Sequence, residues 1–145
     1  MCGVLTDPAG GGVPTASSFM TANENGSKAF DLSAGSKWFA GDMNATGWLA
    51  FTFTGTTTHV VTSYSVTSGN DFNQRDPKDW QLQGSNNGSV WVTVDQKTGQ
   101  MFASRFQTIS YPCTNSTAYR AYRILISANN GSPALQVAEL ALYGK

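Results

Sequence analysis

Alternating hydrophobicity is the feature that most constrains how this chain folds. In the segment GWLAFTFT, residues 47–54, the side chains of Leu49, Phe51 and Phe53 fall on one face and their neighbours fall on the other. A period of two is typical of a β-strand, in which successive side chains point to opposite sides. The segment is therefore predicted to be a strand with one buried face.

Similar runs recur along the chain, separated by turn residues at intervals of roughly ten residues. Two of the turns contain Asn-Gly, beginning at Asn87 and at Asn130, and this pair tolerates the positive φ angles of tight β-turns. No stretch carries apolar residues at helical spacing over three turns. The predicted fold class is all-β, a sandwich or a barrel. The strands are expected within residues 47–54, 58–68, 80–85, 89–95, 119–128 and 135–144.

A length of 145 residues fits one domain with a single core. Residues 1–14, which include the segment DPAGGGVP, are expected to be a linker or a segment added for expression, and residues 15–145 the folded module. No apolar run of about 18 residues is present, and the first residues do not resemble a signal peptide. Because the composition is rich in Thr, Ser, Asn and Gly, we expect a secreted or extracellular protein whose signal peptide is not in this chain.

The charge balance excludes several classes of partner. Only 12% of the residues are charged, and nine basic residues face nine acidic ones. Such a chain has no net field to steer nucleic acid or an anionic membrane toward it. We therefore expect neither nucleic acid binding nor membrane insertion.

The two cysteines, Cys2 and Cys113, can close one long loop. The number of cysteines alone does not establish a disulfide, because pairing depends on geometry.

Charged side chains concentrate in SVTSGNDFNQRDPKDWQLQGSNNGSVW, residues 65–91, where Asp71, Arg75, Asp76, Lys78 and Asp79 lie within nine positions. Proline cannot donate to the ladder of a central strand, so Pro77 predicts that this stretch is a loop. A long loop of this kind either binds a ligand or is held by its own hydrogen bonds.

Two interpretations of the loop stay open. In the structural one, Arg75 forms a forked ion pair with Asp71 or Asp79. In the functional one, Asn70, Asp71 and Arg75 hydrogen-bond a polar ligand and Phe72 forms an apolar floor. One loop can serve both purposes.

Several segments together resemble a known family. SGNDFNQRDPKDWQLQGSNNGSVW, SKAFDLSAGSKWF, GWLAFTF, YRAYRILI and LQVAELALYG are similar, in this order, to segments of the discoidin-like, coagulation factor V/VIII type C superfamily. They resemble in particular its bacterial galactose-binding-like carbohydrate-binding modules. The resemblance covers roughly residues 15–144.

This resemblance implies a jelly-roll-like β-sandwich of about eight main strands, one structural calcium ion and a shallow glycan site formed by loops at one end. Carried over by position, the implied calcium ligands are Ala29, Asp31, Ser33, Ser36, Ala138 and Glu139, with the two alanines acting through their carbonyl oxygens.

The chain departs from the family pattern within the implied calcium loop. Ser33 stands where many members have a second Asp, and Leu32 where they have Gly, which weakens the expected ion site. The alternative is that Asp31 caps a turn and Glu139 pairs with Lys28 or Lys37.

No catalytic motif is present. His59 is the single histidine and lies in a Thr-rich strand, no pair of carboxylates is marked for glycoside hydrolysis, and zinc spacing is absent. We therefore expect the chain not to be an enzyme.

Aromatic side chains can stack against the C–H face of a sugar. Trp38, Trp80 and Trp91 fall at positions that the family fills with core residues, whereas Trp48 is not assigned to the core. Phe39, Phe72, Phe102 and Tyr111 are expected in or beside loops, as candidates for a sugar platform.

The sequence thus predicts a non-catalytic carbohydrate-binding module, monomeric and linked to a glycan-active enzyme in its parent protein. The predicted ligand-binding residues are Asn70, Asp71, Phe72, Arg75, Phe39 and Tyr111. The alternative is a cell-surface or phage adhesion or assembly module that binds a protein surface.

Overall fold

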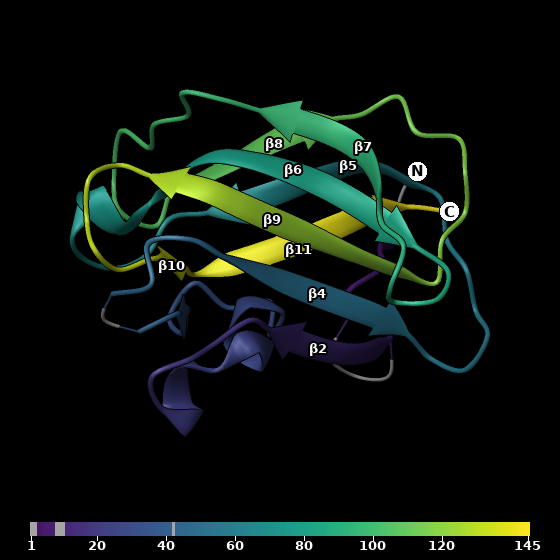
Figure 1. Ribbon diagram of the computed structural model, residues 1–145, viewed down its shortest axis with the longest axis horizontal. Helices are drawn as coiled ribbons and strands as arrows, with labels where there is room; N and C mark the ends of the chain where they lie inside the picture. Colours follow the sequence, from purple (N-terminus) through teal and green to yellow (C-terminus); the bar gives the residue numbers. More distant parts are fainter. Residues whose placement is uncertain (1–2, 8–10, 42) are drawn as a thin grey trace.

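The computed structural model describes residues 3–7, 11–41 and 43–145 and shows two facing β-sheets (Figure 1). The five-stranded sheet lies in front in Figure 1, in the order β2 (Gly12–Ala16), β4 (Gly47–Phe53), β9 (Ala121–Asn129), β6 (Pro77–Ser85) and β7 (Val92–Lys97). The four-stranded sheet behind it has the order β1 (Gly3–Val4), β11 (Glu139–Gly144), β5 (Val61–Thr67) and β8 (Thr108–Pro112). The predicted all-β sandwich is confirmed.

Smaller elements close one side of the sandwich. β10 (Gln136–Val137) pairs with β3 (Trp38–Phe39) in a two-stranded sheet. Three short 3-10 helices are present, η1 (Ala22–Glu24), η2 (Gly26–Ala29) and η3 (Asn73–Arg75). No helix in the described ranges is long and apolar enough to span a bilayer.

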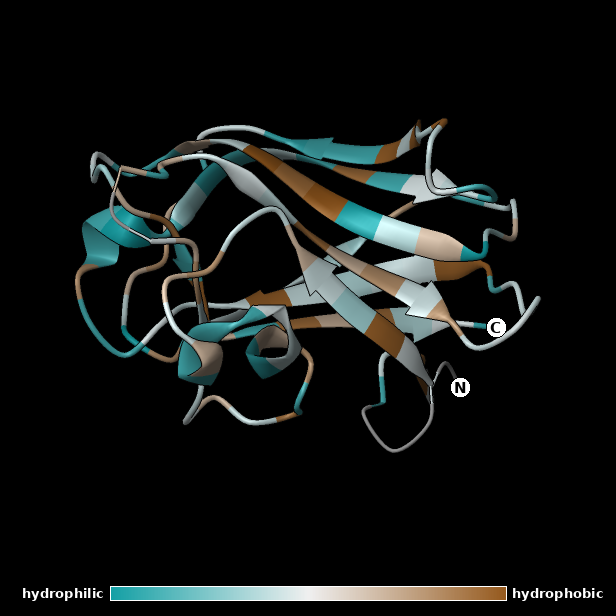
Figure 2. Ribbon diagram, turned by 60° about the horizontal axis from the view of Figure 1, so that its bottom comes forward, coloured by the Kyte–Doolittle hydropathy of each residue, from teal (hydrophilic) through white to brown (hydrophobic). Residues whose placement is uncertain are grey.

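The core lies between the two large sheets and is built from alternate residues of their strands, an alternation visible along several strands in Figure 2. Leu49, Phe51 and Phe53 are at most 2% exposed, as the period of two predicts. Trp38 and Trp80 are also fully buried, as predicted.

The prediction of a buried position for Trp91 is wrong. Trp91 lies just before β7 and is only half-buried, and the guanidinium carbon of Arg123 lies 4.3 Å from the centre of its ring.

A chain of buried hydrogen bonds crosses the core. The indole Nε1 of Trp80 donates to the hydroxyl of Tyr64 at 2.9 Å, and that hydroxyl donates to Asp95 Oδ2 at 2.6 Å. Tyr111 stacks on Tyr64 with ring centres 5.2 Å apart, but its own buried hydroxyl has no partner among the described atoms. Burial raises the pKa of Tyr111 to about 12. Two tyrosines in contact therefore differ in whether their hydroxyl groups are paired.

The N-terminal residues take part in the sheets. β1 pairs with β11, and β2 pairs with β4 on both sides of Thr15, where the sequence analysis placed the start of the module. The backbone groups of Gly3–Val4 and residues 12–14 therefore belong to sheet ladders. That residues 1–14 are a linker or an added segment, and that the module begins at Thr15, stays a prediction.

Cys2 lies outside the described residues, so its pairing with Cys113 stays a prediction. Cys113 is partly buried, and its thiol donates to the carbonyl of Val61 at 3.4 Å. Burial raises the pKa of this thiol.

The proposed loop around Pro77 is shorter than predicted. Pro77 is the first residue of β6 and lies opposite Asn129, and the register of this pairing shifts around Asp79. A proline is tolerated at the first residue of a strand, where its missing N–H costs little. Lys78 and Asp79 consequently belong to the strand, and the loop ends at Asp76.

We expect replacement of Tyr64 by Phe to lower the free energy of unfolding by about 1–3 kcal/mol, because it leaves the buried indole N–H of Trp80 without an acceptor. Tyr111→Phe is the matched control. It removes a buried hydroxyl without a described partner, so it should change stability by less than about 0.5 kcal/mol or raise it. Urea unfolding of the two variants checks this, and equal losses would contradict it.

Candidate functional site

Residues 68–76 form the loop that leads from β5 to β6 at one end of the sandwich, at the left of Figure 1. We call it the β5–β6 loop. Phe72 adopts a left-handed conformation with φ of 37° and begins the sharp bend into η3. Side chains from three distant segments hold this bend in place.

Asp71 is the first point of attachment. Its Oδ1 accepts a hydrogen bond of 3.0 Å from Lys37 Nζ and lies 3.7 Å from a guanidinium nitrogen of Arg75. Although burial opposes it, Lys37 holds the pKa of the Asp71 carboxyl below its ordinary value. Gln136 completes the set, because its amide donates to the backbone carbonyl of Asp71 at 2.7 Å and accepts from Lys37 at 2.8 Å.

Asp76 is the second point of attachment. Its carboxylate is 1% exposed and accepts hydrogen bonds from both terminal nitrogens of Arg105, at 2.9 and 2.5 Å. Burial raises the pKa of the Asp76 carboxyl and the Arg105 fork opposes that rise, while hydrogen bonding to Asp76 raises the pKa of Arg105. Arg105 also donates to the carbonyl of Asp71 at 3.2 Å, so one side chain binds the loop at two points, Asp71 and Asp76.

Arg75 lies between two aromatic rings. Its guanidinium carbon is 4.8 Å from the centre of the Phe39 ring and 4.3 Å from that of Phe72. Phe39 is 6% exposed and Phe72 is 60% exposed. The stack therefore supports an apolar ring at the surface, with a cation beneath it.

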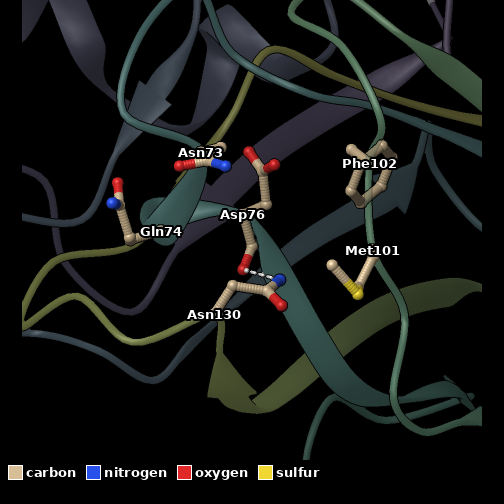
Figure 3. Close-up of a pocket in the computed structure, with 6 residues that line it drawn as sticks. All are labelled: Asn73, Gln74, Asp76, Met101, Phe102 and Asn130. Atoms are coloured by element: carbon tan, nitrogen blue, oxygen red, sulfur yellow. Dashed lines mark hydrogen bonds between the residues drawn. The ribbon is translucent and has the colours of Figure 1, made fainter.

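Two hollows include residues of the β5–β6 loop, although Phe72 lines neither. One contains Asn70 beside Lys37, Glu24 and Asn23. The other is lined by Asn73, Gln74, Asp76, Met101, Phe102 and Asn130 (Figure 3). Asn130 Nδ2 donates to the carbonyl of Asp76 at 3.1 Å, the dashed line of Figure 3, which fixes the floor of this hollow.

The structure brings together five of the six predicted ligand-binding residues. Asn70, Asp71, Phe72 and Arg75 share the loop, and Phe39 lies beneath Arg75, although it is buried and cannot itself face a ligand. The sixth, Tyr111, is corrected: it is 5% exposed within β8, where it stacks on Tyr64 and meets Trp80 edge-on. The structural interpretation holds in part, because Asp71 is engaged by Lys37 and lies 3.7 Å from Arg75, whereas the forked pair joins Arg105 to Asp76. Asn70 and Phe72 are exposed, and their contact with a ligand stays a prediction.

The three residues that hold the loop carry no sequence pattern that predicted this role; they are Lys37, Arg105 and Gln136. Each lies about 30 or more positions from its partner in the loop. Arg105 stands alone among uncharged neighbours in the sequence, which is the one signal that a specific partner was needed.

The predicted calcium ligands form a second cluster beside this site. Asp31 accepts hydrogen bonds from the amide of Ser33 at 3.0 Å and from the hydroxyl of Ser36, while the hydroxyl of Ser33 accepts from Gly35. Leu32 has φ of 59°, and its amide donates to Glu139 Oε2 at 3.1 Å. The bend at Leu32 thus joins the Asp31 segment to the first residue of β11.

Glu139 is only partly satisfied. It is 8% exposed, and its second oxygen, Oε1, has no hydrogen-bond partner among the described atoms. Burial, with the nearby Asp31 carboxylate, raises the pKa of Glu139 to about 8. No ion pair joins Glu139 to a described lysine, and Lys37 is committed to Asp71. Asp31 thus caps the turn, as the alternative predicted, whereas no described lysine pairs with Glu139. The calcium ion stays a prediction.

Ala29, at the end of η2, and Ala138, between β10 and β11, are both fully buried near this cluster. No three His, Cys, Asp or Glu side chains gather at one point in the part of the chain that is described. An ion here would therefore need carbonyl, hydroxyl and water oxygens besides the carboxylates of Asp31 and Glu139, which are ligands that calcium accepts.

Comparison with known proteins identifies the family to which the chain belongs. The profile of the F5/8 type C domain matches residues 14–140. The chain belongs to the F5/8 type C domain family. The resemblance to the discoidin-like superfamily is thereby confirmed.

Solved structures with the same fold include carbohydrate-binding modules. A chitosan-binding module from a chitosanase/glucanase of Paenibacillus sp. IK-5 is 19% identical, has a TM-score of 0.77, and the match covers 98% of this chain and 99% of that one. Two modules from Clostridium perfringens have the same TM-score. One, in complex with GalNAc-β-1,3-galactose, is 14% identical, and the match covers 97% of this chain and 99% of that one. The other, a family 32 module in complex with galactose, is 15% identical, and the match covers 99% of each chain.

A curated relative is more similar in sequence. A peptide-N(4)-(N-acetyl-beta-glucosaminyl)asparagine amidase from Arabidopsis thaliana is 34% identical over an alignment of 120 residues, and the match covers 79% of this chain. The chain spans 17% of the length of that amidase, so the likeness concerns one part of it.

Proposed function

We propose that the chain is a non-catalytic carbohydrate-binding module whose ligand lies on the β5–β6 loop. The observation that carries this proposal is the exposed ring of Phe72, held by Arg75 over the buried Phe39 and flanked by the amides of Asn70 and Asn73. An aromatic face beside hydrogen-bonding groups suits a sugar ring, which has apolar C–H faces and polar edges.

The ties of the loop support this use. Lys37, Gln136 and Arg105 fix the loop before any ligand arrives, so little conformational entropy is lost on binding. The small open hollows that Asn70 and Asn73 help to line suit one or two sugar rings and a modest affinity, with a dissociation constant of about 1 μM to 1 mM.

The relatives support the same ligand class. The solved structures that share the fold bind chitosan, galactose or GalNAc-β-1,3-galactose, and the curated relative is an amidase of glycan-bearing asparagine. We infer that this chain is a monomeric part of a secreted or extracellular protein with a glycan-active domain. Tethering of this kind raises the local concentration of an enzyme on its polymer without new contacts.

A non-catalytic role agrees with the position of His59. It precedes β5, at the opposite end of that strand from the β5–β6 loop, and its ring packs edge-on against Phe53 with centres 4.5 Å apart. Of the carboxylates beside the proposed sugar site, Asp71 and Asp76 are paired with cations, and Glu24 accepts a hydrogen bond from the Thr21 hydroxyl.

We also propose that a structural calcium ion binds at Asp31, Ser36 and Glu139, with carbonyl oxygens of Ala29 and Ala138. The Ser33 amide donates to Asp31, and the Ser33 hydroxyl accepts from the amide of Gly35. Ser33 is therefore the least suited of the predicted ligands. The ion would neutralise the two carboxylates and fix residues 31–36, which lead directly to Lys37 and hence to Asp71.

A protein-binding adhesion module is the second candidate. The observation that favours it is the group of large apolar side chains exposed on the loops, Phe72, Met101 and Phe106, which are 60%, 76% and 50% exposed. Such exposure is typical of interaction surfaces.

Sugar binding predicts a specific effect of Phe72→Ala. Loss of the stacking ring should weaken binding to galactose- or N-acetylgalactosamine-containing oligosaccharides about 5- to 20-fold in isothermal titration calorimetry. Phe19→Ala, which removes a ring that is 53% exposed in a different hollow, should leave affinity unchanged. A glycan array without any ligand, together with capture of a protein that both Phe72→Ala and Phe106→Ala abolish, would favour the adhesion module instead.

Calcium binding predicts a pH-dependent stability. Without the ion, the folded protein holds the proton of Glu139 more tightly than the unfolded chain, whose ordinary pKa is 4.5. The stability is therefore fully present below that pH and is lost as the pH rises toward about 8, and calcium should offset the loss because it binds the charged form.

Thermal unfolding with calcium or with a chelator, from about pH 5 to about pH 8, measures this difference. Glu139→Gln should flatten the pH dependence in chelator and abolish the response to calcium. A melting temperature that ignores calcium at every pH would reject the ion while leaving the sugar proposal intact.

A further inference from the structure

The outer face of the five-stranded sheet, the side away from the core, presents a second ordered set of binding groups. Figure 1 looks onto this face, and no helix crosses in front of β4, β9 and β6. The strand register aligns its outward side chains in two rows that run from β4 through β9 and β6 to β7. The rows are Trp48, Leu125, Gln81 and Gln96, and Ala50, Arg123, Gln83 and Thr93.

Arg123 stands at the centre of the face. Its Nε donates to Gln83 Oε1 at 2.7 Å, and its guanidinium lies on the ring of Trp91. It forms no salt bridge with any residue in the described ranges. Burial lowers its pKa, as expected for a cation without a counter-charge. Its two terminal nitrogens thus remain as a rigid fork of donors, the geometry that binds a carboxylate.

The amides beside Arg123 are fixed by one another. Gln83 Nε2 donates to Gln81 Oε1 at 3.0 Å, and the Thr93 hydroxyl donates to the same oxygen at 3.1 Å. Gln83 is 8% exposed although it points outward, because Arg123 and Trp91 lie beside it. These two hydrogen bonds fix the Gln81 amide through its oxygen. Its amide nitrogen has no acceptor among the described atoms and remains available as a donor.

A groove follows the same strands toward the start of β6. It is lined by Asp79, Trp80, Gln81, Gln96, Lys97, Thr98, Leu125 and Ser127. Trp48, half-buried on β4, lies directly across from Leu125 at its side. With strands about 4.8 Å apart, the face from β4 to β7 spans roughly 14 Å, which is room for several linked sugars.

We propose that this outer face is a second carbohydrate site, which takes an extended polysaccharide rich in uronic acid. A sugar carboxylate binds the fork of Arg123, hydroxyl groups meet the amides of Gln81 and Gln96, and a ring packs on Trp48. Charge complementarity favours an acidic chain. Arg123 has no counter-charge among the described residues, Lys97 of the groove is paired with Asp95, and Asp79 at the rim is bonded to the amide of Gly99.

The site is separate from the β5–β6 loop, so it goes beyond the function proposed above. A chain with both sites would hold a polymer along the sheet and a shorter sugar at the loop end.

Titration of an oligogalacturonate into 15N-labelled protein tests this proposal. The indole signals of Trp48 and Trp91 should shift, and Arg123→Gln and Arg123→Lys should each weaken binding about tenfold or more, because neither retains the fork. Trp48→Ala should weaken binding severalfold and keeps the test valid if the Arg123 variants unfold. Val13→Ala, on the far edge of the same face, and Phe72→Ala, at the loop site, should have no effect.

Shifts confined to the β5–β6 loop, or unchanged affinity in Arg123→Gln, would overturn the proposal without touching the loop site. Equal binding of a neutral galactan oligosaccharide would overturn the assignment of Arg123 to a carboxylate. Loss of oligogalacturonate binding in Phe72→Ala, with binding kept in Arg123→Gln, would also overturn the proposal, because it would place the acidic sugar at the loop.

Discussion

The ion pair between Arg105 and the buried Asp76 anchors the β5–β6 loop at one end of the sandwich. A carboxylate that is 1% exposed needs a charged partner, and Arg105 supplies it from a segment 29 positions away while also holding the carbonyl of Asp71. Lys37 and Gln136 attach Asp71 to the opposite side. The β5–β6 loop is thus attached to three segments that lie far from it in the sequence. The concentration of charge in this loop is explained by these attachments.

These attachments decide which groups reach solvent. Because Asp71, Asp76 and Arg75 are engaged within the protein, the exposed ring of Phe72 and the neighbouring amides are left for a ligand. The Asp31–Glu139 cluster lies at the start of the segment that ends in Lys37, so order there extends to the loop. The outer face works in the same way: Arg123 is held by Trp91 and Gln83, and its terminal nitrogens stay outside. In both places internal contacts orient the groups that remain free.

The scaffold was readable from sequence where one physical rule dominates. The alternation at Leu49, Phe51 and Phe53 identified a strand and its buried face, and the order of the family segments identified the sandwich. Sequence failed where a contact joins distant segments. Tyr111 looked like a loop residue because the strand TISYP carries no clear alternation. Trp91 was placed in the core by the family resemblance, and nothing nearby in the sequence reveals Arg123 beside its ring. The partners of Asp71 and Asp76 were unreadable for the same reason, since ion pairing leaves no local pattern.

The attachments of Asp71 and Asp76 should make the β5–β6 loop rigid before any ligand binds. Backbone 15N relaxation of the free protein measures this rigidity for residues 70–75. We expect order parameters of about 0.85, equal to those of the flanking strands, whereas values below about 0.6 would show that the loop is mobile.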